Sequence, residues 1–294
     1  MFDVAGFPTS AGSPTMLAAS GIKTKTACAV QQLLDAGARF IGKAVTDELA
    51  FSVIGNNAYF GIPVNGAAPE RYAGGSSSGS ASSVSCGLCD FSLGTDSGGS
   101  VRGPASQCGL FGPRVVNAVS DALESAQSLW GQAHRVKAAP VDLNDVLKAY
   151  QALQGREIWK HDGTFIEKYQ PTFGPGVKER FAFAKTVHDK DLTEQESLCE
   201  QAVRHINGLL ADSSVLILPT LPGAGLKLDC SPDDMNAFRS KMSASFCLGG
   251  LAGVPWITLP LTEIDGAPLG VSLVSACGTD AWLLELSKAL VQNR

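Results

Sequence analysis

The sequence contains few charged residues and no concentration of one sign. Only 17% of its 294 residues are Asp, Glu, Lys or Arg, and the formal net charge is −5. No stripe rich in lysine and arginine occurs along the chain. We therefore expect neither nucleic acid nor an anionic membrane surface as a partner.

Long apolar runs and a leader pattern are also lacking. No run of eighteen apolar residues occurs, and the opening MFDVAGFPTS does not have the charged-then-apolar order of a signal peptide. The expected location is the cytoplasm, with no membrane span. The chain is nevertheless 45% hydrophobic, which is ample for a large buried core.

Groupings of metal or cofactor ligands are missing as well. The eight cysteines have no framework spacing, which favours reduced thiols over disulfides. Cys86 and Cys89 form one close pair, but a zinc site needs two further ligands at matching spacing, and the four histidines are isolated from one another. Lys43 follows a glycine as in a phosphate-binding loop, yet Ala44 stands where that loop needs Ser or Thr. We predict no metal and no cofactor.

Helix and strand patterns alternate along the chain, which predicts an α/β fold in a single domain over residues 1–294. The apolar runs predict strands at 38–45, 134–140, 214–220, 256–260 and 269–275. Helices are predicted from capping residues and stop signals at 27–37, 121–129, 142–155, across much of 156–212, from 231 and from 280.

Two clusters of glycine and serine stand out between these elements: Gly74 to Gly79 (GGSSSG) and Asp96 to Ser100 (DSGGS). Paired glycines directly before serines indicate backbone that approaches something closely, which we interpret as a substrate carbonyl. If Ser100 is a nucleophile, the preceding glycines offer unobstructed N–H groups for an oxyanion hole. A serine hydroxyl also needs a base, and no histidine lies in a recognisable pairing motif.

The stretch GGSSSGSASSVSCGLCDFSLGTDSGGSVRGPASQCGLFG resembles the amidase signature family of serine hydrolases. The likeness continues through GKAVTDELAF, LQGREIW, FGPGVKERF, LPTLPG and GLAGVPWITLPL, and it is closest to the indole-acetamide hydrolase type. The resemblance implies one large mixed β-sheet covered by helices, incomplete in this chain.

The resemblance also implies a catalytic triad of a serine nucleophile, a serine in a cis peptide and a lysine base. Matched by motif, the nucleophile is Ser100, the relay is Ser76, and Gly75–Ser76 is the cis bond. The implied oxyanion donors are the backbone N–H groups of Ser97, Gly98 and Gly99. Ser77 would support the hydrogen-bond network, and Asp96 with Arg102 would form a buried supporting pair.

The chain departs from the family pattern in two places. The base lysine would fall just before Phe2-Asp3-Val4, upstream of Met1, and the chain is shortened after Arg114. Lys43 is no substitute, because the family has its own lysine in that segment. Three explanations stay open: a start placed too late, an inactive remnant, or a non-catalytic binding or scaffold protein.

The implied function is hydrolysis of the C–N bond of a small carboxamide, aromatic or not, through a seryl acyl-enzyme that releases acid and ammonia. The expected partner is this small-molecule amide. Trp256 and Phe246 are candidates for the acyl pocket, although core packing is the stronger interpretation. Missing strands would expose sheet edges, so we also expect weak stability or self-association, with a homodimer as one form.

Overall fold

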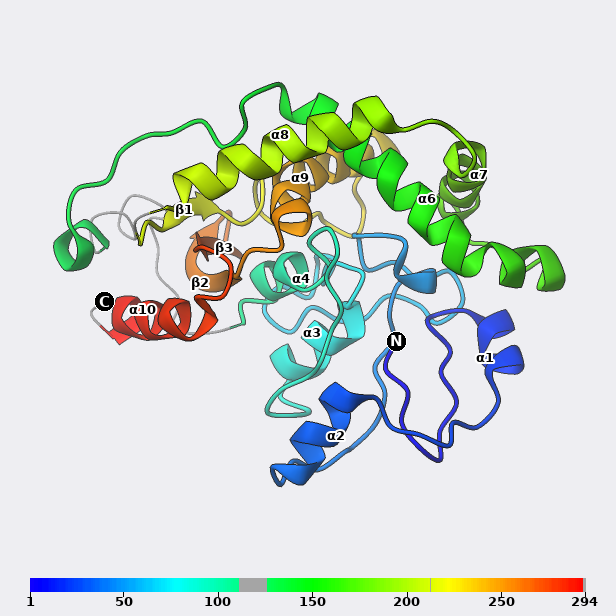
Figure 1. Ribbon diagram of the computed structural model, residues 1–294. Helices are drawn as coiled ribbons and strands as arrows, with labels where there is room; N and C mark the ends of the chain where they lie inside the picture. The colour runs from blue at the N-terminus through cyan, green and yellow to red at the C-terminus, as the bar shows by residue number, and fades with distance from the viewer. Residues whose placement is uncertain (111–125, 212, 293–294) are drawn as a thin grey trace.

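The computed structural model describes residues 1–110, 126–211 and 213–292, and it places a layer of helices over a small sheet, with a loop-rich N-terminal part beneath (Figure 1). The elements in chain order are α1 (Pro14–Ser20), α2 (Cys28–Asp35), the 3₁₀ turn η1 (Glu48–Ala50), α3 (Ser78–Ser85), α4 (Arg102–Gln107), α6 (Leu143–Tyr169), α7 (Val177–Val187), α8 (Thr193–Leu209), β1 (Leu216–Pro219), α9 (Pro232–Ala252), β2 (Trp256–Ile264), β3 (Ala267–Val274) and α10 (Asp280–Gln292).

The sheet of the described residues has three antiparallel strands in the order β1-β3-β2. Leu216 of β1 and Trp256 of β2 both lie opposite Val274 of β3, so the central strand is paired on both edges. The β2–β3 hairpin turns at Asp265-Gly266, where both residues have positive φ. This Asp-Gly pair suits the two-residue turn whose twist matches that of the flanking strands.

Both faces of the sheet are covered, which is why every residue of β3 is buried. Leu273 packs with Leu283 and Leu290 of α10 on one face. Val274 packs on the other face with residues of the helical layer formed by α6, α8 and α9. A strand buried on both sides needs a continuous apolar run, and LGVSLV provides one.

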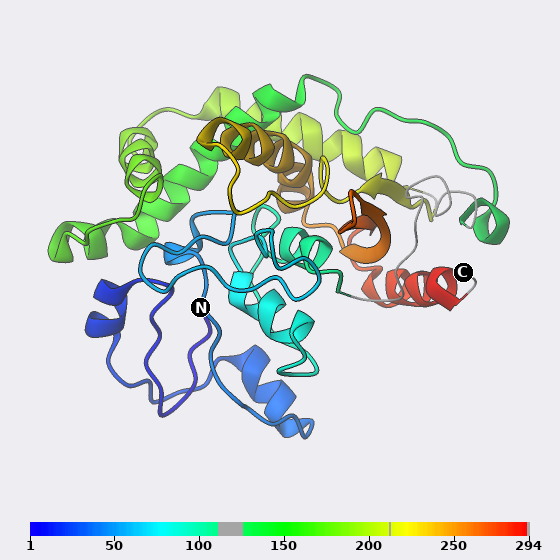
Figure 2. The same cartoon turned by 180° about the vertical axis from the view of Figure 1, so that it is seen from behind.

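The long helices of this layer begin at side-chain caps. Asp142 accepts a hydrogen bond from the backbone N–H of Asn144 at the start of α6, and Ser231 accepts one from Asp234 at the start of α9. Each cap satisfies an N–H group that has no partner within the helix. From behind, the layer again spans the top of the molecule and the N-terminal part lies below it (Figure 2).

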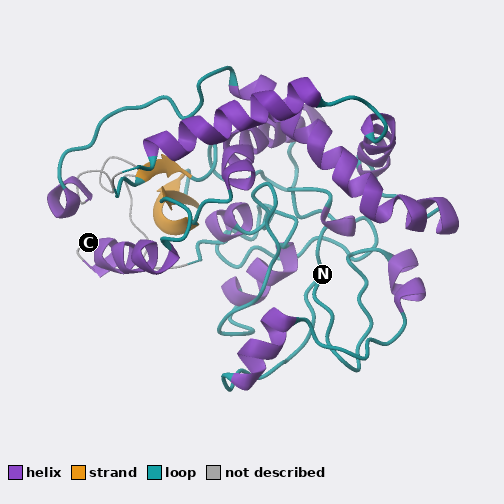
Figure 3. Ribbon diagram, viewed as in Figure 1, coloured by secondary structure: helices purple, strands orange, loops and turns teal. Residues whose placement is uncertain are grey.

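The N-terminal part consists mostly of loops with short helices (Figure 3). It is joined to the sheet through α4, where Ser106 Oγ accepts a hydrogen bond of 2.6 Å from the backbone N–H of Gly270 in β3. A Cβ at Gly270 would lie 2.5 Å from Thr258, so only glycine allows this contact. The loop before α4, which carries Ser100, is therefore fixed against the sheet.

The predicted α/β class is confirmed, with the sheet in the incomplete form that the sequence implied. The three C-terminal strands and the final helix lie where the sequence predicts them. The strands predicted at 38–45 and 134–140 are wrong, because no described segment pairs with either one and both are loops. Most of the helix predicted at 121–129 and the shortening after Arg114 lie outside the described residues.

One local prediction also needs correction. The helix that begins at Leu143 does not stop at Gly155 but continues to Tyr169, because Gly155 packs closely against Ala184 and Val187 of α7. All eight cysteines are free thiols. None of the described helices combines the length and the apolarity that crossing a membrane requires.

The central strand generates a stability prediction. Leu273 is fully buried, so Leu273→Ala should lower the free energy of unfolding by about 2–5 kcal/mol, through lost apolar burial and the cavity left behind. Leu284→Ala on α10 is the matched control, since that side chain is half exposed and its loss should cost less than about 0.5 kcal/mol. Urea unfolding of both variants measures the difference, and equal losses would contradict this account of the core.

Candidate active site

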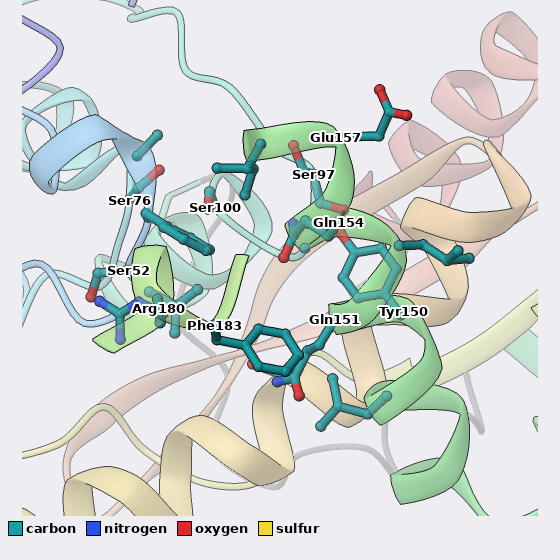
Figure 4. Close-up of a pocket in the computed structure, with 18 of the residues that line it drawn as sticks. Ser52, Ser76, Ser97, Ser100, Tyr150, Gln151, Gln154, Glu157, Arg180 and Phe183 are labelled. Carbon is teal, nitrogen blue, oxygen red and sulfur yellow. Dashed lines mark hydrogen bonds between the residues drawn. The ribbon is translucent and has the colours of Figure 1, made fainter. Parts of the chain in front are cut away.

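A cavity of about 1110 Å³ opens between the N-terminal loops and helices α6, α7 and α9. Residues of both Gly/Ser clusters line it, namely Ser76, Ser97, Gly98 and Ser100. Figure 4 shows Ser76 and Ser100 on the same side of this central cavity, with Tyr150 and Gln154 on the ribbon of α6. Its size is slightly above the range of about 300–1,000 Å³ that is usual for small-molecule sites.

The first cluster is held by the loop that runs from Thr46 to Gly55. The carbonyl oxygen of Ser76 accepts hydrogen bonds from Thr46 Oγ1 (2.7 Å) and from the backbone N–H of Asp47 (2.9 Å). The Gly75–Ser76 peptide bond is cis. A Cβ at Gly75 would lie 2.2 Å from Asp47 Oδ2, which explains why glycine precedes Ser76. Ser76 is fully buried, and its Oγ has no hydrogen-bond partner among the described residues.

Ser77 joins the first cluster to the second. Its backbone N–H donates to the carbonyl of Ser100 (3.1 Å). Its hydroxyl accepts from the N–H of Thr95 (3.1 Å) and donates to the carbonyl of Thr95 (3.2 Å). These contacts bring Ser76 and Ser100 to one wall of the cavity, although within the described chain no hydrogen bond joins their two hydroxyls.

The backbone between Asp96 and Ser100 turns sharply against α9. Gly99 has a φ of +106°, and a Cβ there would lie 2.2 Å from the Phe246 ring. Both the backbone angle and the close contact therefore require glycine. Its N–H donates to Asp96 Oδ1 at 2.7 Å. Of the three N–H groups predicted to form an oxyanion hole, those of Ser97 and Gly98 donate to no other described group, whereas that of Gly99 is already engaged.

Asp96 and Arg102 form a two-point ion pair, with Nε to Oδ2 at 3.0 Å and Nη2 to Oδ1 at 2.7 Å. Both side chains are less than one-fifth exposed. Burial alone would raise the pKa of Asp96, but the hydrogen bonds and charge of Arg102 outweigh it and bring the pKa to about 2. The Arg102 guanidinium lies 4.6 Å from the Phe246 ring centre and 4.5 Å from that of Trp256. These two rings therefore hold Arg102 and do not line the cavity.

Asp47 is the most unusual titratable group next to the cavity. It is fully buried, and desolvation raises its pKa to about 6. Hydrogen bonds from the backbone of Gly55 and from Ser52, and the positive charge of Arg180, oppose that rise. The sequence pattern gave no reason to single out Asp47, because its burial follows from the packing of two loops distant in sequence.

Helix α6 contributes a second set of residues that the sequence did not predict. Tyr150 Oη donates to the carbonyl of Ser97 (3.0 Å) and accepts from Gln154 Nε2 (3.0 Å). Burial raises the pKa of Tyr150 to about 12, so it stays a neutral hydrogen-bond donor. The spacing of these two residues places them on one face of a helix, but only the tertiary structure decides which face meets the nucleophile loop.

The lysines near the cavity are engaged elsewhere. Lys43 Nζ donates to Pro8 O and Thr9 Oγ1, both at 2.8 Å, and the residue does not line the cavity. Lys148 lines it but is three-quarters exposed and pairs with Asp145 at 3.0 Å. Over the described ranges no three His, Cys, Asp or Glu side chains are grouped to hold a metal ion.

The Asp96–Arg102 pair generates a first prediction for the site. Arg102→Gln leaves a desolvated carboxylate with a weaker partner and should cost about 3–5 kcal/mol of folding free energy at pH 7. Because the native pKa of Asp96 lies below its unfolded value, the pair's contribution is full above about pH 4 and fades as the pH falls toward 2. Arg204→Gln breaks an exposed pair and should cost less than about 0.5 kcal/mol. Denaturant unfolding at pH 7 and pH 3 gives both differences, and a loss for Arg102→Gln no larger than the control would overturn the assignment.

The raised pKa of Asp47 gives a second prediction, in which stability falls with rising pH instead of increasing. Its native pKa of about 6 lies above the unfolded value of 3.8, so ionisation should lower stability by about 3 kcal/mol as the pH rises from 4 to 7. Asp47→Asn removes this titration, and the variant should gain stability relative to the parent over that range. Thermal and urea unfolding at pH 4, 5, 6 and 7 measure the gap, and parallel curves for the two proteins would refute it.

Comparisons with known proteins agree with this geometry. The Amidase family profile matches residues 1–122. Amidase 1 of Arabidopsis thaliana is 29% identical over 384 aligned positions, which cover 99% of this chain and 90% of that protein. The chloroplastic outer envelope protein 64 of the same plant is 26% identical, over 97% of this chain and 64% of that protein. A solved amidase crystal structure superposes with a TM-score of 0.79 at 23% identity, covering 99% of this chain and 81% of that one.

The aligned lengths bear on the predicted shortening. An alignment of 384 positions leaves at least 90 without a residue from this 294-residue chain (384 less 294), although the chain spans nearly the whole relative. This agrees with a shortened member of the family. The profile matched over residues 1–122, the similarity along the whole chain and the superposed fold together support the amidase signature family as the family of this chain, and its amidase relatives support a hydrolase.

Proposed function

We propose that this chain hydrolyses a small primary carboxamide to a carboxylic acid and ammonia through an ester on Ser100 Oγ. The observation that carries the proposal is the arrangement of the two Gly/Ser clusters. Ser76 and Ser100, which belong to different clusters, line one cavity and are joined through Ser77. The amide carbon would sit against Ser100, the more accessible of the two serines.

The reaction proceeds in two halves. Ser100 Oγ attacks the amide carbon as its proton passes to Ser76, whose own proton passes to a base beside it. The tetrahedral intermediate then expels the nitrogen, which takes a proton from Ser76 and leaves as ammonia, while the base returns its proton to Ser76. Water then attacks the ester carbon, and the same relay in reverse frees the acid and restores the Ser100 hydroxyl. The N–H groups of Ser97 and Gly98 would stabilise the oxyanion in each half, because they line the cavity without another described acceptor.

The relay needs a proton acceptor beside Ser76. Ser76 Oγ is buried and has no described hydrogen-bond partner. This unpaired hydroxyl supports the proposal that a proton acceptor hydrogen-bonds to Ser76 during the reaction. A neutral lysine can take this role when burial lowers its pKa.

Three wider expectations remain proposals. Residues 1–294 would form one domain, the protein would self-associate as a homodimer without a nucleic-acid or membrane partner, and the location would be cytoplasmic. The relative named as a chloroplastic outer envelope protein makes the last of these worth measuring by cell fractionation.

The test is ammonia release from a panel of aliphatic and aromatic primary amides. Ser100→Ala should reduce the rate by about 10⁴-fold or more, because the ester can no longer form. Ser82→Ala on α3 is the matched control, since that serine does not line the cavity and should leave the rate unchanged.

A fluorophosphonate probe gives an independent reading. Stoichiometric labelling at Ser100, lost in Ser100→Ala and kept in Ser82→Ala, would support an activated nucleophile. Absence of both ammonia release and labelling would reject hydrolysis by this chain and favour a non-catalytic binding role instead.

A further inference from the structure

The peptide group between Ser97 and Gly98 lies against two helices at the edge of the cavity. From α6, Tyr150 Oη donates a hydrogen bond of 3.0 Å to the carbonyl oxygen of Ser97. From α9, the backbone of Gly250 comes so close that a Cβ there would lie 2.2 Å from the same oxygen. Only glycine allows this approach, because a side chain would displace the carbonyl.

The hydroxyl of Tyr150 is itself held in place. It accepts a hydrogen bond of 3.0 Å from Gln154 Nε2, one turn further along α6. A Cβ at Gly98 would lie 3.4 Å from Tyr150 Oη, so the hydroxyl also packs against the next residue of the loop. Figure 4 shows the side chains of Tyr150 and Gln154 pointing toward Ser97, and all three residues line the cavity.

This hydrogen bond also determines where the N–H group of Gly98 points. Within the described chain the one cis peptide bond is Gly75–Ser76, so the bond between Ser97 and Gly98 is trans. In a planar trans peptide group the C=O and N–H bonds point in opposite directions. Holding the carbonyl of Ser97 on the helix side therefore leaves the N–H of Gly98 directed away from the helices.

The rest of the loop does not supply this restraint. Asp96 binds the N–H groups of Gly99, Val101 and Arg102, which lie beyond the peptide group in question. Among the described residues, the hydrogen bond from Tyr150 is the one that this peptide group makes. A peptide group next to glycine rotates easily. Rotated by half a turn, it would present its carbonyl oxygen to the cavity and repel a developing oxyanion.

We propose that Tyr150 is a positioning residue for the oxyanion hole, which directs the N–H of Gly98 into the cavity by holding the carbonyl of Ser97. Gln154 orients the hydroxyl of Tyr150, and Gly250 leaves room for the carbonyl. The inference rests on the proposed function, in which an oxyanion forms on the substrate carbonyl. Tyr150 acts through the peptide group and does not contact the reacting atoms.

The first experiment measures ammonia release from the best primary amide of the parent protein. Tyr150→Phe keeps the ring and removes the hydroxyl. It should lower kcat about 10-fold and change KM less than about 2-fold, because the oxyanion is present only in the transition state. Losing an oxyanion donor outright costs about 10²–10³ in kcat, and misdirecting one costs less.

Tyr59→Phe is the matched control. The hydroxyl of Tyr59 also donates to a backbone carbonyl, that of Thr172, but Tyr59 does not line the cavity. Its removal should leave kcat and KM unchanged. A kcat for Tyr150→Phe equal to that of the control would overturn the inference.

A double-mutant cycle tests the role of Gln154. Gln154→Leu should lower kcat about 3-fold in the parent and have no effect when added to Tyr150→Phe, since Gln154 acts through the hydroxyl that is then absent. The same 3-fold loss in both backgrounds would mean that Gln154 acts independently of Tyr150, and it would contradict this part of the proposal.

Gly250 gives a test that leaves Tyr150 intact. Gly250→Ala places a methyl group against the carbonyl of Ser97 and should lower kcat about 10-fold. Gly208→Ala on α8 is the matched control, since its Cβ would meet no atom within 4 Å. Thermal melts show which variants fold. An unchanged kcat in folded Gly250→Ala would contradict the need for a fixed carbonyl.

Nuclear magnetic resonance separates this inference from the proposed function. Tyr150→Phe should lower the ¹⁵N order parameter of Gly98 from about 0.85 toward 0.6, or change the residual dipolar coupling of its N–H bond, and Tyr59→Phe should do neither. If Tyr150→Phe changes neither quantity, the inference is wrong even in an active enzyme. A change in a parent that releases no ammonia would support the positioning contact and reject hydrolysis by this chain.

Discussion

The carboxylate of Asp96 holds the loop that carries Ser100. It accepts hydrogen bonds from the backbone N–H groups of Gly99, Val101 and Arg102 and from two nitrogens of the Arg102 side chain. Arg102 is in turn fixed between the rings of Phe246 and Trp256. The position of Ser100 therefore depends on the sheet and α9, through one ion pair that burial makes strong.

The cavity combines a neutral reaction centre with charged surroundings. Ser76, Ser100 and the free N–H groups of Ser97 and Gly98 carry no charge, which suits a carbonyl that becomes negative only during reaction. Arg180 and Arg239 carry charge that no described ion pair balances. The uncharged groups lie in the loops before α3 and α4, whereas the two arginines lie on α7 and α9.

The sequence predicted the strands of 214–220, 256–260 and 269–275 because each is a short run of mostly apolar residues. It failed at 38–45, where a similar run has no neighbouring strand to pair with. It also placed Ser76 and Ser100 in one site only through a family resemblance. Periodicity alone could not join two segments separated by α3, since long-range contacts leave no local pattern.

By itself, the sequence determined the chemistry that the chain can offer: two serines within glycine-rich backbone and a compensating Asp and Arg. Glycine at positions 75 and 99 is dictated by contacts too close for any Cβ, and that requirement is visible in the residue type. Only the tertiary structure decided the surroundings, because Asp47, Tyr150, Arg180 and Arg239 acquire their burial and their neighbours from loops and helices distant in sequence. Burial and electrostatic coupling are properties of packing, and packing is settled only when the whole chain has folded.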